Sequence, residues 1–334
     1  MIVSIQYLRA LAVILVLLIH ISDKSGQYGT GIFDFRDGRF GVDIFFVISG
    51  FVMYYVTLGE KSGLSTIWVF LKHRIIRIIP LYWFLTFIAL IVYIVLPIST
   101  YHGGEISIVK SFFLFPIDFP KEKYLIPIAW TLSYEFYFYL LFSITLLFSR
   151  HRGMIATSIL LSLVSVGCYL QLSHDHVLLR FLTNSLLLEF FYGILVVHLY
   201  QKIHTHKILF SIIFFILFTL SYTLYSMDFR TGYRGIDLGI PAIFLVLSFI
   251  MIETQIKRYL FNPMIHIGAA SFSLYLIHPF VLTFFSLVYK RIGIHSELSE
   301  WVFILIMFAG SLVIGSLTYY FIEKNMTKYF RSKA

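Results

Sequence analysis

The sequence is dominated by about ten apolar runs of roughly twenty residues, and no other feature constrains its fold as strongly. A helix needs about 20 predominantly apolar residues to cross the hydrocarbon core of a bilayer. We therefore predict an all-α fold, a polytopic membrane helix bundle of about ten transmembrane helices. The runs lie at about 4–21, 41–58, 75–97, 129–148, 154–172, 181–201, 207–225, 235–252, 264–288 and 301–323.

Composition excludes most other classes of protein. Apolar residues make up 59% of the 334 residues and charged residues 13%, about half the share of an ordinary soluble domain. The net charge of +9 does not indicate nucleic-acid binding, because the basic residues stand in short clusters between apolar runs. The single cysteine, Cys168, can form no intrachain disulfide and says nothing about the compartment. We find no repeat and no linker, and predict one transmembrane domain over 1–334 with no appended soluble domain.

The basic residues predict an orientation in the membrane. The first run holds Arg9 and lacks a small-residue cleavage pattern, so we expect it to remain as a helix. Cytoplasmic loops carry an excess of Lys and Arg. The segments 22–40, 98–128 and 289–300 mix acids with basic residues, which is typical of the outer side. We therefore expect both termini in the cytoplasm, with basic and nearly acid-free inner segments at 72–74, 150–152, 202–207, 257–258 and 324–333.

Three arginines are predicted at the cytoplasmic ends of the runs: Arg9, Arg74 and Arg77. An ionisable side chain inside a bilayer costs about 2.5–3.5 kcal/mol, so each needs a partner or a function. Arg74 and Arg77 share one helix face, and two guanidinium forks suit a phosphate group. The alternative is that Arg9 snorkels to the interface and that the other two follow the positive-inside rule.

A second layer of ionisable residues is predicted towards the outer side: His20, Asp43, Glu135 and His278. His20 lies on the same helix face as Arg9, about 16 Å further along the axis. This layer resembles acid–base chemistry, whereas the alternative for each histidine is a packed, hydrogen-bonded side chain.

Ser49 and Gly50 fall near mid-depth of the second run. A glycine there permits close approach by a neighbouring helix or by a thin ligand arm, and helix packing is the more ordinary reading. Glu189 in the sixth run is interpreted as a structural pair with a helix neighbour. We find no Gly-rich phosphate loop and no Cys/His metal spacing, so no metal is predicted.

Five segments together resemble acyltransferase family 3, the membrane-bound O-acyltransferases that modify bacterial polysaccharides. They match the family's arginine–histidine opening, its FFxxSG segment, its RxxR motif, its tryptophan–glutamate stretch and its late serine–tyrosine–histidine segment. Thr131 stands where serine is common, and Phe272 replaces the first tyrosine. The segments are, in order, 8–20, 41–51, 74–83, 130–137 and 271–278.

The resemblance implies acetyl-CoA, or a similar acyl-CoA, as a donor substrate rather than a tightly bound cofactor. It implies a sugar hydroxyl of a surface glycan as acceptor, either O-antigen, capsule or exopolysaccharide, and a place in the bacterial inner membrane. Arg9 is then a CoA-side residue, His20 the base, and Arg74 and Arg77 donor-binding residues. The family often carries an appended esterase-like domain, for which this chain leaves no room after the tenth run.

The expected mechanism rests CoA phosphates on the three arginines and threads the pantetheine arm past Ser49-Gly50 towards His20. His20 removes the hydroxyl proton, while Glu135 or Asp43 orients the imidazole; an acyl-His20 intermediate is the variant mechanism. His278 is a further candidate at the same depth. Two other functions stay open, namely a transporter of an anion or lipid-linked sugar and a non-catalytic partner in glycan assembly. The expected partners are acetyl-CoA, the glycan acceptor and the lipid bilayer, with no nucleic acid and the oligomeric state left open.

Overall fold

The computed structural model describes residues 2–29, 31–95, 104–148, 151–170, 176–292 and 297–333. The described chain is almost wholly helical, and its two short strands, β1 (Glu105–Ile106) and β2 (Glu122–Lys123), pair in parallel. Within these residues nine helices are long and apolar enough to cross a membrane. The all-α membrane fold is therefore confirmed. Arg150 and the ends of the predicted runs at 96–97 and 171–172 lie outside the described residues.

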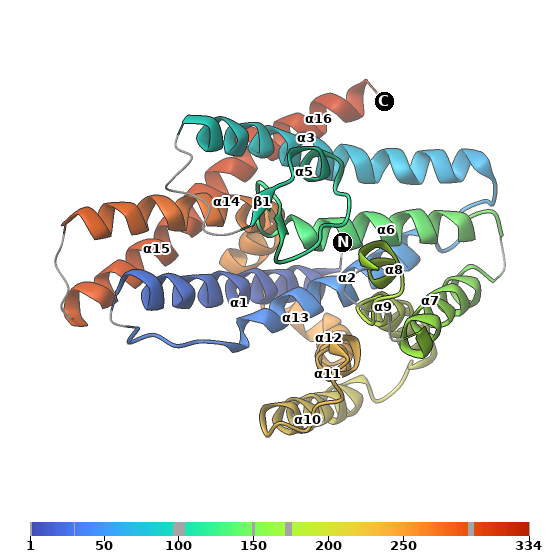
Figure 1. Cartoon of the computed structure of the whole chain (residues 1–334). Coiled ribbons are helices and arrows are strands. Elements are labelled where there is room, and N and C mark those ends of the chain that lie inside the picture. The colour runs from blue at the N-terminus through green and yellow to red at the C-terminus, as the bar shows by residue number, and fades with distance from the viewer. Residues whose placement is uncertain are drawn as a thin grey trace. The chain divides into compact units, whose positions relative to one another are not determined.

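The chain divides into two compact units. The first unit combines Met1–Val42 with Glu253–Lys333, the blue and the orange-to-red parts of the chain in Figure 1, and the second holds Asp43–Ile252. The helices of the first unit are α1 (Val3–Tyr28), η1 (Asp37–Arg39), α13 (Glu253–Ile256), α14 (Asn262–Ile292), α15 (Glu297–Thr318), the π-helical η2 (Tyr319–Glu323) and α16 (Lys324–Ser332).

The second unit begins within α2 and contains the remaining helices. Among its helices, α3 contacts α6, α9 contacts α7 and α12, and α12 contacts α10. The helices are α2 (Phe40–Thr57), α3 (Leu64–Val95), α5 (Ile108–Phe113), α6 (Ala129–Thr145), α7 (Arg152–Leu170), α8 (Val177–Leu182), α9 (Leu187–Lys202), α10 (Lys207–Ser226), α11 (Arg234–Asp237) and α12 (Gly239–Met251).

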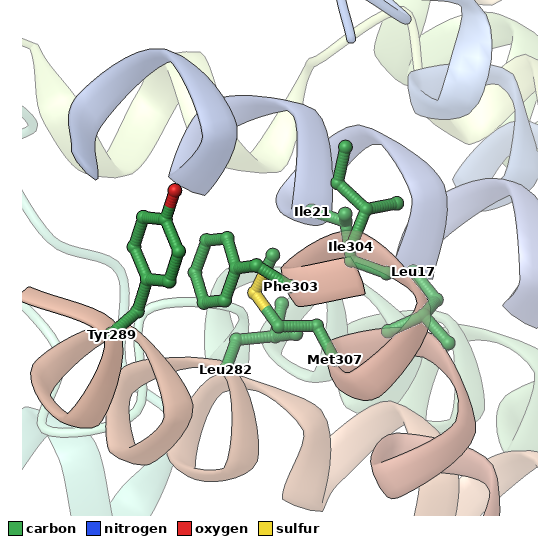
Figure 2. Packing of buried hydrophobic residues seen from close by; sticks show 7 residues of the cluster. All are labelled: Leu17, Ile21, Leu282, Tyr289, Phe303, Ile304 and Met307. Carbon is green, nitrogen blue, oxygen red and sulfur yellow. The ribbon is translucent and has the colours of Figure 1, made fainter. Parts of the chain in front are cut away.

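Helices α1, α14 and α15 share a buried apolar core in the first unit, drawn in Figure 2. At its centre the rings of Tyr289 and Phe303 stack with 4.1 Å between centroids. In lipid, dispersion contacts of this kind hold helices together, because the surrounding acyl chains are as apolar as the core. The cluster comprises Leu17, Ile21, Leu282, Tyr289, Phe303, Ile304 and Met307.

Helix α6 was expected over 129–148, but it has 17 residues and is not among the nine candidate spans. At 1.5 Å per residue it is about 26 Å long, slightly less than the ~30 Å hydrocarbon core. Its C-terminal end is nevertheless tied to the loop that precedes α3, because Gly63 N donates to Leu146 O at 3.1 Å. The start of α3 and the end of α6 therefore lie at the same end of the unit.

The opposite end is marked by Tyr82 and Trp83 of α3. Both side chains donate to main-chain carbonyl oxygens of α5, those of Ser111 and Phe112. Tyr82 lies about 27 Å along α3 from Leu64, which is close to the full length of α6. The chain thus leaves by α3 and returns by α6, which is not among the nine candidate spans of the described residues, so the tenth crossing stays a prediction.

Candidate functional site

His20 of α1 and His278 of α14 meet in the first unit. Their rings lie edge to face with 4.9 Å between centroids and 66° between planes. Nearer the start of the same two helices, Arg9 Nε donates to Ser271 Oγ at 3.1 Å. On each helix the residue of the arginine–serine contact precedes the residue of the histidine pair, so α1 and α14 run parallel. Three of the nine predicted site residues are therefore brought onto one helix pair.

Both imidazoles are held in a defined tautomer by their own helices. His20 Nδ1 lies 2.8 Å from Val16 O, and His278 Nδ1 lies 3.3 Å from Leu274 O. A carbonyl oxygen only accepts, so Nδ1 carries the proton in each neutral ring and Nε2 keeps the lone pair. This arrangement leaves each Nε2 able to act as a base.

The Nε2 atom of His278 is buried and has no hydrogen-bond partner among the described residues. The side chain is 1% exposed, whereas His20 is half-buried. An unsatisfied buried polar atom costs about 1–3 kcal/mol and is a mark of functional sites. His20 is the more exposed of the two imidazoles.

An apolar crevice too narrow to admit a water molecule borders His278. Its walls come from α1, α14 and α15. No polar side chain other than His278 contributes to them, so the crevice surrounds this imidazole with a water-poor environment. The lining residues are Val13, Ile14, Leu17, Leu274, His278 and Leu312.

Glu323 is a buried acid of the first unit that the sequence pattern did not single out. Its carboxylate accepts a 2.5 Å hydrogen bond from Ser273 Oγ of α14, and its side chain is 8% exposed. It ends the π-helical segment η2, a geometry that occurs often at functional sites. In the sequence Glu323 looks like an ordinary acid at the end of the last run, and no signal marks its approach to α14.

In the second unit Glu135 of α6 joins Ser49 of α2. One carboxylate oxygen accepts hydrogen bonds from Ser49 Oγ at 3.4 Å and from Tyr139 OH. Tyr139 lies one helical turn after Glu135 and is 2% exposed. Glu135 and Ser49 were predicted, whereas Tyr139 was missed; its spacing of four residues from Glu135 is the signal that could have found it.

Arg74 approaches this group through an aromatic contact. Its guanidinium lies 5.5 Å from the ring centroid of Phe70, and that ring meets the ring of Tyr139 edge to face at 6.3 Å. Arg77, three residues further along α3, is half-buried and makes no hydrogen bond within the described part of the chain. The ring contacts therefore connect Arg74 with Tyr139 and Glu135, and both arginines lie close enough to Tyr139 to interact with it electrostatically.

Asp43 is engaged by an arginine from α11. Both of its carboxylate oxygens accept from Arg234, at 2.9 Å from Nε and 3.0 Å from Nη2. The Arg234 guanidinium also lies 5.6 Å from the Trp130 ring centroid, and the wholly buried Glu189 lies beside the pair. Arg234 was missed because it stands between two apolar runs and resembles a loop residue. A bidentate pair of this kind fixes the Asp43 side chain.

Gly50 is used for helix packing. A Cβ atom at Gly50 would collide with the carbonyl oxygen of Phe190, and a Cβ at Gly193 would collide with α2. The backbones of α2 and α9 are thus in direct contact at this depth, as in other small-residue helix interfaces. The space beside Gly50 is occupied by α9, so the packing alternative describes this glycine.

These observations define a polytopic helical membrane protein in which buried acid–base and cationic side chains gather at specific helix contacts. A family model described as an acyltransferase domain matches residues 2–320, and the chain belongs to acyltransferase family 3. The resemblance seen in its motifs is confirmed.

Two curated relatives extend the comparison. The chain is 26% identical over 329 residues to the exopolysaccharide production protein ExoZ of Rhizobium meliloti, covering 95% of this chain and 96% of that protein. It is 25% identical over 358 aligned residues to the O-acetyltransferase OatA of Staphylococcus aureus, covering 96% of this chain and 56% of OatA. It thus spans about half the length of OatA. No solved structure matches the chain.

Proposed function

We propose that the protein is a membrane O-acyltransferase that moves an acetyl group from acetyl-CoA to a sugar hydroxyl of a surface glycan. Family membership and the similarity to the exopolysaccharide production protein ExoZ and the O-acetyltransferase OatA support this proposal. The observation that carries it is the tautomer of His20, whose Nδ1–H is held by Val16 O while Nε2 keeps its lone pair. A general base needs this arrangement.

The proposed reaction is a single displacement. The Nε2 atom of His20 takes the proton of the acceptor hydroxyl while its oxygen attacks the thioester carbonyl. The new C–O bond forms, the C–S bond breaks, and the imidazolium returns the proton to the CoA thiolate. An acyl-His20 intermediate is the variant, with the same net exchange. In either form His278 packs against His20 and restricts the orientation of its ring.

We propose the three arginines as the binding groups for the CoA phosphates. Arg9 lies about 16 Å along α1 from His20, which requires an extended donor bound between the two. Each charge-assisted contact contributes about 1.5–3 kcal/mol. The donor side is proposed as cytoplasmic and the acceptor side as the outer face of a bacterial inner membrane, with both termini in the cytoplasm. O-antigen, capsule and exopolysaccharide are the acceptor classes.

The test uses purified protein in lipid nanodiscs with labelled acetyl-CoA and an oligosaccharide acceptor, measuring CoA release and O-acetyl transfer. His20→Gln should lower transfer by about 10²–10⁴-fold while donor binding survives. The double variant Arg74→Gln/Arg77→Gln should weaken donor binding. The control is Arg258→Gln, an exposed arginine of a basic segment.

Two outcomes would contradict the proposal. Movement of sugar or anion across the bilayer without CoA release would indicate a transporter. Normal glycan acetylation in cells that carry His20→Gln would indicate a non-catalytic partner.

A further inference from the structure

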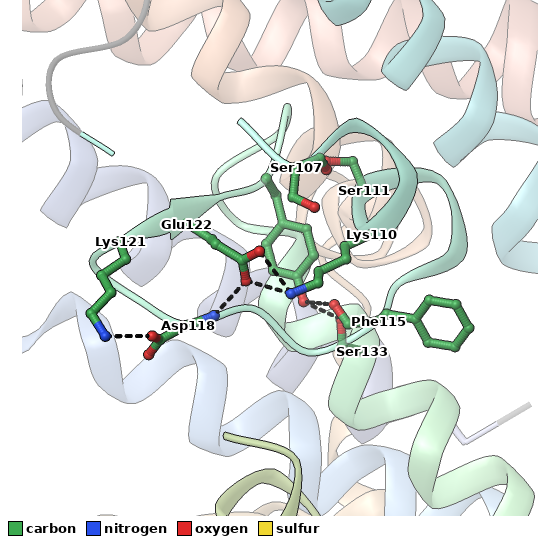
Figure 3. A network of polar contacts seen from close by, with 9 residues as sticks. Ser107, Lys110, Ser111, Phe115, Asp118, Lys121, Glu122 and Ser133 are labelled. Carbon is green, nitrogen blue, oxygen red and sulfur yellow. Dashed lines mark hydrogen bonds and ion pairs between the residues drawn. The ribbon is translucent and has the colours of Figure 1, made fainter. Parts of the chain in front are cut away.

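A shallow, open hollow of about 770 Å³ lies in the segment that joins α3 to α6, whose polar contacts are drawn in Figure 3. Volumes of about 300–1,000 Å³ are typical of small-molecule sites. This hollow belongs to the second unit and shares no residue with the predicted site. Its lining residues are Gly104, Glu105, Lys110, Asp118, Lys121 and Glu122.

The charged walls of the hollow hold one another in place. Lys110 Nζ lies 2.7 and 2.5 Å from the two carboxylate oxygens of Glu122, and Asp118 N donates to the same carboxylate at 2.9 Å. Lys121 Nζ pairs with the Asp118 carboxylate at 3.1 Å. The hydrogen bond from Lys110 lowers the pKa of Glu122, so this carboxylate is ionised at neutral pH.

The segment that carries the hollow is attached to α3 and α6 by hydrogen bonds. Tyr124 OH donates to Phe115 O at 2.7 Å and lies 2.9 Å from Ser133 Oγ of α6. Leu125 N donates to Ser111 Oγ, and Tyr82 of α3 donates to Ser111 O. A site whose walls are ordered before binding loses little entropy when a ligand arrives.

The chemistry of the lining selects one class of ligand. Three carboxylates against two ammonium groups disfavour an anion such as phosphate. Within the described residues no group of three or more His, Cys, Asp or Glu side chains could hold a metal ion. Alternating donors and acceptors instead match sugar hydroxyls, which do both.

The position of the hollow along α3 fits an acceptor. The segment attaches to α3 at Tyr82 and Trp83, about 12 Å along the helix axis from Arg74. A donor phosphate at Arg74 and a saccharide at the hollow would therefore lie about 12 Å apart along one helix.

We propose that this hollow is a saccharide-binding subsite for the glycan acceptor, with Lys110, Glu122 and Glu105 as its main polar contacts. The identification of the ligand as the glycan acceptor rests on the proposed acyltransferase function. The binding itself is a separate property that can be measured without any acetyl donor.

The probe is the oligosaccharide released by mild acid from the surface polysaccharide of the host strain and de-O-acetylated with alkali. Its binding to protein in nanodiscs is measured by saturation-transfer difference NMR without acetyl-CoA. Glu122→Gln should raise the dissociation constant at least about tenfold, as expected for loss of a charge-assisted contact. Asp34→Asn is the matched control, because that acid also pairs with a basic side chain in a loop.

Glu105→Gln keeps the test informative if Glu122→Gln disturbs the fold. The Glu105 side chain is exposed and makes no hydrogen bond among the described residues, so its replacement should weaken saccharide binding without lowering the unfolding temperature. In the transfer assay both variants should raise the acceptor KM.

The two proposals fail in different ways. If the wild-type protein binds the oligosaccharide but transfers no acetyl group, the acyltransferase proposal fails and the subsite stands. If transfer is normal and both variants bind the oligosaccharide as tightly as the wild-type protein, the subsite is overturned.

Discussion

The imidazole of His20 packs edge to face against that of His278, with 4.9 Å between ring centroids, although the two residues lie near opposite ends of the sequence. Each ring donates from Nδ1 to the carbonyl oxygen one turn before it. The pair therefore presents two lone-pair nitrogens whose directions are fixed by helices rather than by loops. Rigid support of this kind is what a positioned base requires.

This contact predicts a coupled loss of activity. His278→Gln should lower acetyl transfer about 10–100-fold, because His20 loses the ring that limits its orientation. The double variant His20→Gln/His278→Gln should be no less active than His20→Gln alone, since residues that act as a unit are not additive. Losses that multiply in the double variant would contradict a shared function.

The matched control for this experiment is His266→Gln. His266 also lies on α14, where its Nε2 lies 3.1 Å from Ser316 Oγ and its ring stacks on Tyr320. Transfer within about twofold of the wild-type rate is expected. Turnover is measured at equal protein content, with the unfolding temperature of each variant recorded beside it.

A second prediction concerns Tyr139, whose hydroxyl donates to Glu135. Tyr139→Phe removes a hydrogen bond to a charged group, worth about 1.5–3 kcal/mol, and leaves Glu135 with the longer contact to Ser49. If Glu135 takes part in transfer, kcat/KM should fall about 10–150-fold. Tyr137→Phe is the control, because that hydroxyl donates only to Leu182 O. Equal effects of the two replacements would argue against a role for Glu135.

Periodicity predicted the parts of this structure that depend on one helix at a time. The apolar runs located the helices, and the spacing of Arg9 and His20 placed both on the face that meets α14. The run 129–148 contains the 17-residue helix α6, which is not among the candidate spans, so its crossing stays a prediction. In each case the information lies within about twenty consecutive residues.

The missed residues are those whose role depends on a partner from a distant helix. Arg234 meets Asp43, and Glu323 meets Ser273, through contacts between elements far apart in the sequence. Nothing in the local pattern distinguishes such an arginine or glutamate from a solvated loop residue. Gly50 shows that a local pattern can also fit two functions. A glycine at this position suits either a ligand arm or a neighbouring helix, and the close packing of α9 against Gly50 distinguishes the two.

Arg152 provides a third prediction, on stability. The sequence suggested a solvated basic segment, but the guanidinium is buried at 5% exposure and donates to four main-chain carbonyls. Arg152→Lys should lower the free energy of unfolding by about 3 kcal/mol or more, because an ammonium group cannot match the fork and leaves buried carbonyls unpaired. The acceptors are the oxygens of Phe148, Thr57, Glu60 and Lys61.

The control is Arg230→Lys, at an arginine 49% exposed and paired with Asp228. It should change the free energy of unfolding by less than about 0.5 kcal/mol. Both variants are compared by thermal unfolding in the same detergent. Equal stability of Arg152→Lys and the wild-type protein would mean that an ammonium group can replace the buried guanidinium group.

A fourth prediction concerns pH. Helix α1 has no side-chain cap of its own, and the N–H groups of Val3 and Ser4 donate to Glu253 at 2.9 and 2.7 Å. Burial alone would raise the pKa of Glu253, but these hydrogen bonds and Lys257 outweigh it and hold the pKa below its usual range. The stabilisation by ionised Glu253 is therefore complete above the unfolded pKa of about 4.3 and disappears as pH falls through the lower folded value.

Glu253→Gln should accordingly destabilise the protein by about 0.5–2 kcal/mol at pH 7, and the difference from wild type should shrink at acidic pH. Asp34→Asn removes the same charge from a side chain 62% exposed and should have little effect at any pH. Unfolding temperatures measured between about pH 3 and pH 7 distinguish the two. A constant offset for Glu253→Gln across this range would show that its charge does not act on α1.

The last prediction concerns the path of the chain through the membrane. Because Arg152 donates to the carbonyl oxygen of Lys61, the loops before α3 and after α6 must face the same side of the bilayer. In a Cys168→Ser background, single cysteines at Lys61 and His151 should therefore be labelled together by an impermeant maleimide. A cysteine at Phe119, whose side chain is 67% exposed, should be labelled from the other side.

The positive-inside orientation also predicts which side of the membrane each of these loops faces. Intact cells should expose cysteines at Phe119 and Leu298 to the reagent and protect those at Lys61 and His151 until the membrane is opened. Labelling of Lys61 and His151 from the outside, with Phe119 protected, would invert the orientation but preserve the crossing of α6. Labelling of Lys61 and His151 from opposite sides would contradict the hydrogen bonds that join the two loops, and with them the tenth crossing.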